Sequence, residues 1–194
     1  MIEAAIGGVG SAIGRVRLGA SKSLREASER APESVYPHFD FFVGLLSSKN
    51  HILKWNATLT LANLAAVDGE GKLDRIMDLY LGPIDGPHMI DAANAICGAA
   101  AIAVAKPHLA PAIARRILAV ERARYATPEC RNVAIGHAIR ALDRFFDALD
   151  DKNSVLAFVR RQTENPRPAT RAKAERFLRK RGGQARAARA GRDS

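Results

Sequence analysis

The sequence is poor in cysteine and contains no long hydrophobic run. Its two cysteines, Cys97 and Cys130, lie far apart and lack the CxxC or Cys/His spacing of zinc sites and redox pairs. The longest uncharged apolar run, residues 95–105, contains 11 residues, whereas a membrane-spanning helix needs roughly 20. We therefore expect a cytoplasmic protein with no membrane span, no bound metal and no cofactor.

Residues 1–20 contain five glycines but lack the pattern of an export signal. The acid Glu3 precedes the apolar stretch, and the bases Arg15 and Arg17 follow it, which is the reverse of the order in a signal peptide. Each glycine costs a helix about 1 kcal/mol relative to alanine. We therefore predict that residues 1–20 form a flexible, glycine-rich N-terminus.

Basic residues are concentrated at the C-terminal end. The formal net charge is +10, yet residues 160–194 contain twelve Lys and Arg against three acids, while the first 159 residues contain 18 against 17. Such an end is compatible with binding to nucleic acid or to an acidic partner. It is also typical of a solvated last helix followed by a disordered tail, and composition alone leaves both interpretations open.

The hydrophobic pattern predicts an all-α domain over residues 21–181. Apolar residues recur with a period near 3.6, and no stretch alternates with the period of two that a strand requires. Prolines such as Pro87, Pro107 and Pro128 separate the predicted helices. Residues 182–194 have no apolar stripe to bury, so we predict a basic, disordered tail there.

A repeat is visible when the chain is compared with itself. Four segments align without gaps around a shared alanine, and these alanines are Ala57, Ala93, Ala134 and Ala174. They are separated by 36, 41 and 40 residues, which is the length of a helical hairpin. In each hairpin the alanine is expected to face the core and to let two helices approach closely.

In three of the four segments a base precedes the alanine by three residues, and these bases are Lys54, Arg131 and Arg171. This arrangement resembles the second helix of HEAT repeats. The resemblance covers about residues 36–181 and implies a short right-handed α-α superhelix of about four helical hairpins. Each hairpin of such a stack buries its apolar face against its neighbours.

The outward side of the second helices is the candidate binding surface. The resemblance implies that this side lines the inner, concave face, where a tryptophan beside polar and basic side chains could bind a peptide or another ligand. The candidate residues are Lys54, Trp55, Asp91, Asn94, Arg131, Asn132 and Arg171. The alternative interpretation is that Trp55 is buried against a neighbouring repeat.

The sequence shows no catalytic constellation. His137, Cys97 and Cys130 fall on predicted core positions, where a satisfied histidine and inert thiols are ordinary. The acids around Asp68 and Asp74 precede or begin a predicted helix, where the helix dipole favours them. We therefore expect a non-enzymatic protein.

Two classes of function remain open at this point. The first is a protein-interaction scaffold. The second is nucleic-acid binding, because HEAT-like alkylpurine DNA glycosylases hold duplex DNA on a basic concave face. Those enzymes carry Trp and Asp one helical turn apart, whereas the residue one turn after Trp55 here is Leu59. The resemblance therefore implies binding through the bases and the tail rather than catalysis. A further alternative is that the basic last helix docks an acidic partner or caps an oligomer.

Overall fold

The chain is all-helical, as the hydrophobic period predicted. The computed structural model describes the backbone of residues 1–190 and the side chains of residues 1–181, and this part of the chain contains no strand. The first helices are α1 (Ile2–Val9), α2 (Gly14–Arg30), α3 (Pro32–Val35), α4 (Phe39–Leu45), α5 (His51–Asn63) and α6 (Lys72–Leu81). They are followed by α7 (Met89–Ala105), α8 (Ala110–Leu118), α9 (Pro128–Phe145), α10 (Lys152–Arg161) and α11 (Pro168–Ala190).

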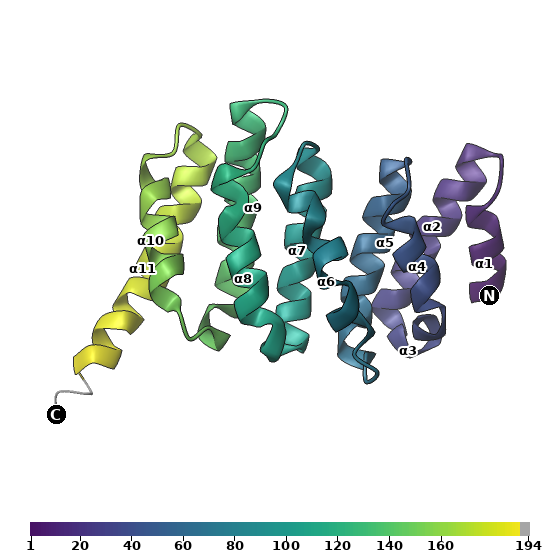
Figure 1. Ribbon diagram of the computed structural model, residues 1–194, viewed down its shortest axis with the longest axis horizontal. Coiled ribbons are helices and arrows are strands. Elements are labelled where there is room, and N and C mark those ends of the chain that lie inside the picture. The colour runs from purple at the N-terminus through teal and green to yellow at the C-terminus, as the bar shows by residue number, and fades with distance from the viewer. Residues whose placement is uncertain (191–194) are drawn as a thin grey trace.

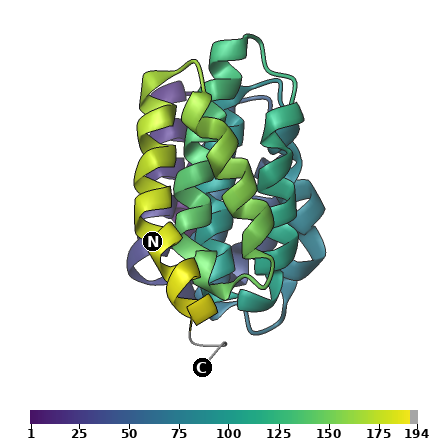
Figure 2. The same ribbon diagram turned by 90° about the vertical axis from the view of Figure 1, so that its left-hand side faces the viewer.

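The helices are arranged in pairs along one long axis (Figure 1). One row consists of α2, α5, α7, α9 and α11, each packed against the next. On its other side, α4 contacts α5, α6 contacts α7, α8 contacts α9 and α10 contacts α11. In the end-on view, α11 (yellow) lies in front of the purple N-terminal segments, α10 (yellow-green) lies beside it, and teal helices lie on the opposite side (Figure 2). Segments close in sequence are thus close in space.

Local sequence signals set the starts of several helices. The side chain of Asn50 accepts hydrogen bonds from the backbone N–H groups of Ile52 and Leu53 at the start of α5. Thr127 and Asp151 cap α9 and α10 in the same way. These side chains satisfy N–H groups that have no partner within the first turn of a helix.

The helical period predicts that Phe39, Phe42, Val43 and Leu46 form an apolar stripe that packs on the stripe containing Leu53 and Leu61. The stripes are buried in part, since Val43 and Leu46 are half-buried. Phe39 and Phe42 of α4 and Leu53 and Leu61 of α5 are each at most 6% exposed. Of the four aligned alanines, three are buried, and these are Ala57, Ala134 and Ala174. The fourth is only half-buried. In α7 the most buried alanines are instead Ala92, Ala95, Ala99, Ala100 and Ala103.

Small residues let the helices of the central row approach closely. Gly98 of α7 lies against Tyr80, whose hydroxyl donates a hydrogen bond of 2.9 Å to the carbonyl of Thr58 in α5. A Cβ atom on Gly98 would overlap that hydroxyl and would lie 3.1 Å from Cβ of Ala62. A glycine is therefore required where Tyr80 bridges the two helices.

The N-terminal segment differs from the expectation of a flexible stretch over residues 1–20. It contains α1 and the first part of α2, and Val9 is buried. A Cβ atom on Gly8 would lie 2.9 Å from Cβ of Ala20. The glycine that was expected to weaken a helix therefore also allows α1 to lie close to α2, and α2 in turn packs on α5.

The C-terminal helix extends further than the sequence suggested. A helix end was expected at Gly182 and Gly183, with a disordered tail over residues 182–194. Instead α11 continues to Ala190 and projects beyond the helices before it (Figure 1). Residues 191–194 lie outside the described part of the chain. Within that part, no helix is both long enough and apolar enough to cross a membrane.

The burial of the aligned alanines leads to a first prediction. Replacing Ala134, which is fully buried, with Leu should lower the free energy of unfolding by about 1–3 kcal/mol, because the added atoms overfill a close helix contact. Ala93→Leu is the matched control, and it should cost less because Ala93 is half-buried. Urea unfolding followed by circular dichroism measures both. Equal stability of the two variants would contradict this account of the packing.

Candidate functional site

The seven residues of the predicted surface lie in separate places. Lys54, Trp55 and Asp91 come together between α5 and α7. Asn132 and Arg171 contact the segment that leads into α11, and Arg131 lines a small separate hollow. Asn94 alone of the seven lines the large groove described below. The predicted surface is therefore not one continuous site.

Asp91 is the acceptor of a hydrogen-bonded cluster between two neighbouring helices. Its side chain is 5% exposed. It accepts hydrogen bonds from Nε1 of Trp55, from Nδ1 of His51 at 3.0 Å and from Nζ of Lys54 at 3.3 Å. Burial raises the pKa of this carboxyl, but the hydrogen bonds from Trp55, His51 and Lys54 outweigh burial and lower it.

This cluster corrects the prediction that Trp55 and Asp91 face outward into an open groove. Trp55 is half-buried, and its indole N–H is used to bind Asp91 of the next helix in the row. The two residues are 36 apart in the sequence, so they occupy equivalent positions in adjacent helices. Because the Asp91 carboxylate already accepts from three donors, it serves to join α5 to α7. This agrees with the alternative interpretation, in which Trp55 packs against a neighbouring helix pair instead of lining an open groove.

Asn132 and Arg171 also join elements rather than line an open surface. The side-chain oxygen of Asn132 accepts from Nδ2 of Asn165 at 3.2 Å, and its carbonyl accepts from the hydroxyl of Thr170 at 2.8 Å. Arg171 donates to the carbonyl of Asn165 at 2.9 Å. Asn132 therefore holds the start of α11 beside α9, whereas Arg171 ties α11 to the segment that leads into it.

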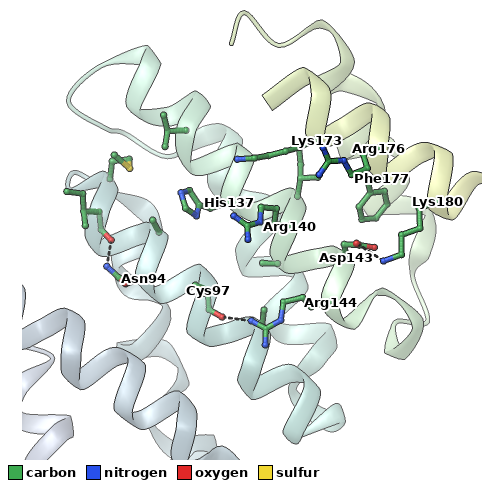
Figure 3. A pocket seen from close by; sticks show the side chains of 17 residues that line it. Asn94, Cys97, His137, Arg140, Asp143, Arg144, Lys173, Arg176, Phe177 and Lys180 are labelled. Atoms are coloured by element: carbon green, nitrogen blue, oxygen red, sulfur yellow. Dashed lines mark hydrogen bonds and ion pairs between the residues drawn. The ribbon is translucent and has the colours of Figure 1, made fainter. Parts of the chain in front are cut away.

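A groove of about 940 Å³ runs across α7, α9 and α11. Figure 3 shows Asn94 and Cys97 on α7, His137 and Arg140 on α9, and the side chains of α11 reaching in from the opposite side. Exposed Ile90 and half-buried Ala93 add apolar surface on α7. Phe177 of α11, only 3% exposed, lies beneath the cations.

Two stripes of cationic or titratable side chains run along this groove. The stripe on α9 consists of His137, Arg140 and Arg144. The stripe on α11 consists of Lys173, Arg176 and Lys180. Within each stripe the residues follow the spacing i, i+3, i+7, so they share one helix face and span about 10 Å along it. Each member of the second stripe lies 36 residues after its counterpart.

The close contact between α9 and α11 brings these charges together. Gly136 has no side chain, and a Cβ atom there would lie 2.9 Å from Nζ of Lys173. Burial, together with the charges of Arg140 and Arg167, lowers the pKa of Lys173. Burial also lowers the pKa of His137, and the charges of Lys173, Arg140 and Arg167 add to this effect. The surroundings of His137 and Lys173 thus disfavour the protonated form of each, because other cations lie nearby.

One acid lines the groove, and cations of the same helix pair already bind it. Asp143 contacts Nζ of Lys180 at 2.8 Å and Nε of Arg181 at 2.7 Å. Burial raises the pKa of Asp143, but these two hydrogen bonds outweigh burial and lower it. Among the described side chains, none of the groove's other lining residues is an acid.

The sequence-based interpretation placed His137 and Cys97 in the core, and this was wrong. His137 is half-buried and Cys97 is exposed, and both line the groove. Ala93 was expected to face the core but lines the groove, so the prediction also placed neighbouring residues of α7 on the wrong side. The signal that could have revealed the site is the recurrence of bases at i, i+3, i+7 after 36 residues.

The described side chains offer no group of three or more His, Cys, Asp or Glu that could hold a metal ion. Comparison with known proteins identifies no relative: no protein-family model matches the sequence, and no curated protein matches it.

The Asp91 cluster leads to a second prediction. Asp91→Ala should lower the free energy of unfolding by about 2–3 kcal/mol, because Trp55 and Lys54 lose a charged acceptor in a buried position. Asn94→Ala is the control on the same helix, since Asn94 bonds only to the carbonyl of Ile90 in its own helix. Chemical unfolding measures both values. If the Asp91 and Asn94 variants were equally stable, the cluster would not join α5 to α7 as described.

A third prediction concerns His137 and pH. Because the pKa of His137 is lowered in the folded chain, the unfolded chain binds the proton more readily in the interval between that pKa and the ordinary value of about 6.5. The free energy of unfolding should therefore fall as the pH decreases through this interval. His137→Gln should reduce the slope, while His88→Gln, at an exposed position, should keep it. Urea unfolding from about pH 7 to about pH 5 measures the slopes, and identical slopes in the wild type and His137→Gln would refute the assignment.

Proposed function

We propose that this chain is a non-enzymatic protein-interaction scaffold, built as a short HEAT-like stack of helical hairpins, and that it binds a segment of a partner protein in the groove across α7, α9 and α11. The observation that carries the proposal is the groove itself, which combines an apolar wall with two stripes of cations. The proposal includes a cytoplasmic location, which the free thiols of Cys97 and Cys130 support.

The recurring contacts between neighbouring helix pairs support the repeat part of this proposal. Trp55 and Asp91 are 36 residues apart, Thr170 and the carbonyl of Asn132 are 38 apart, and Arg161 and Glu121 are 40 apart. Each pair joins an element to the next one in its row. Stacks in which every repeat contacts only its neighbours present long surfaces for binding.

The composition and position of the groove support its role as the binding surface. A volume of about 940 Å³ is at the upper end of the range of ligand pockets. Ile90 supplies an apolar contact, and Arg140 and Arg176 supply charged donors, which is the combination that binding sites for protein segments use. Because the groove is formed by three helices of the central row, its walls are on rigid elements.

A second candidate function is binding of a nucleic acid, and the cations of the groove favour it. Arg140, Lys173 and Arg176 line one continuous hollow, and phosphate groups are attracted to such clusters. Binding of this kind would be electrostatic, non-specific and strongly dependent on salt. The two candidate functions differ in how they use the apolar wall on α7. A protein segment would contact this wall, whereas a nucleic acid would bind mainly to the cations.

The proposal is tested by filling the groove. Cys97→Trp places a large side chain at an exposed position of the groove wall, and we expect it to reduce capture of partner proteins by about tenfold or more in proximity labelling in the native cell. Val104→Trp is the matched control, because Val104 is an exposed residue of the same helix outside the groove. It should capture the same proteins as the wild type.

Circular dichroism and thermal melting of both variants establish that they are folded. Only proteins that are lost with Cys97→Trp and retained with Val104→Trp count as groove partners. If the Cys97→Trp variant captures the same proteins at the same level as the wild type, the groove is not the binding surface.

A further inference from the structure

The two walls of the groove differ in chemistry. The wall formed by α7 carries no charge, and its exposed parts come from Ile90, which is 49% exposed, from Ala93 and from Cys97. The opposite wall, formed by α11, presents Lys173, Arg176 and Lys180. α9 lies between them and contributes His137, Arg140 and Arg144 (Figure 3). The groove is therefore apolar along one side and cationic along the other.

The charge on the cationic side is not balanced within the described part of the chain. Arg140, Arg144, Lys173 and Arg176 form no ion pair with any acid whose side chain the structure describes. The one acid in the groove, Asp143, is already bound by Lys180 and by Arg181. Four positive charges of the groove lining are thus not balanced by an acid.

Partial burial makes positive charge costly at Lys173 and His137, whereas Arg140 and Arg176 are exposed. The lowered pKa of Lys173 arises from burial and from neighbouring cations, and that of His137 has the same origin. Like charges that are partly removed from water repel one another more strongly than they would in solution. An anion that enters the groove relieves this repulsion and accepts hydrogen bonds from the same side chains.

We propose that the occupant of the groove is an acidic, amphipathic segment of a partner protein, with its apolar side on α7 and its carboxylates on the stripes of α9 and α11. This inference rests on the function proposed above and specifies the chemistry of the partner. The spacing i, i+3, i+7 on each stripe matches acids spaced in the same way on one face of a helix, over about 10 Å. The apolar wall then contacts the other face of that helix.

The lining of the groove favours a protein segment over a nucleic acid. Single-stranded nucleic acids bind through aromatic side chains on which bases stack, but the aromatic residue of this groove, Phe177, is 3% exposed. On the α7 wall, the amide of Asn94 is bonded to its own helix. A run of phosphates would contact the cations and leave Ile90 and Cys97 uncovered, whereas an amphipathic peptide covers both walls.

The experiment is a selection of peptides from a random-sequence display library on the full chain at low salt. Selection is repeated with the double variant Arg140→Gln and Arg176→Gln, in which the groove loses two of its unbalanced charges. The matched control is Arg160→Gln with Arg179→Gln, two exposed bases outside the groove. Selected peptides are then measured by fluorescence anisotropy, together with single-stranded and duplex oligonucleotides.

We expect the selected peptides to carry Asp or Glu at helical spacing beside apolar residues. The groove variant should weaken their binding by about tenfold, and the control variant should leave it nearly unchanged. Replacing the acids of a selected peptide with Gln should weaken binding to a similar extent. Raising the salt concentration should weaken binding of the acidic peptide more than binding of its Gln counterpart.

Three outcomes overturn the inference. Peptides without acids that bind in a groove-dependent way would refute the acidic partner while leaving the proposed function intact. Oligonucleotides that bind through Arg140 and Arg176, with no peptide doing so, would refute both and favour the nucleic-acid candidate. If neither probe distinguishes the groove variant from the control variant, the groove does not bind an anionic segment.

Discussion

The close approach of helices within the central row is the constraint on which the rest of the structure depends. α7 has a neighbour on each side, α5 and α9, and most of the residues it buries are alanine or glycine. Gly98 leaves room for the hydroxyl of Tyr80, and Gly136 of α9 leaves room for Lys173 of α11. Since small side chains bury little apolar area each, stability depends on many contacts, repeated between adjacent helix pairs along one continuous core.

Close approach of the helices also determines which acids remain available to pair with the cations of the groove. Asp91 is buried between α5 and α7, and Asp143 binds two cations of α11. A buried carboxylate is tolerated only with such partners, so these acids are used in joining one helix to the next. The cations on the groove side of α9 and α11 are then left facing one another. The positive groove therefore follows from the way in which the helices are joined.

The positions of the helices and much of the core could be predicted from the sequence, because both depend on local pattern. Apolar residues at helical spacing predicted the burial of Phe39, Leu53 and Leu61, and the aligned alanines predicted the close contacts at Ala134 and Ala174. The N-terminus and the length of α11 differed from the prediction. Gly8 was treated as a residue that weakens a helix, whereas its small size also serves contact between α1 and α2.

The site itself was decided by the tertiary structure. Composition and spacing determined the all-helical class and the excess of bases near the C-terminus, since these are properties of the chain in one dimension. They could not determine which side of each helix faces solvent, because a helix with alanine or glycine on several faces has no unique inward side. Only the packing of α7 against both neighbours turned Cys97 and Ala93 toward the groove and Asp91 toward Trp55. Only the pairing of α9 with α11 brought bases that are 36 residues apart to one surface.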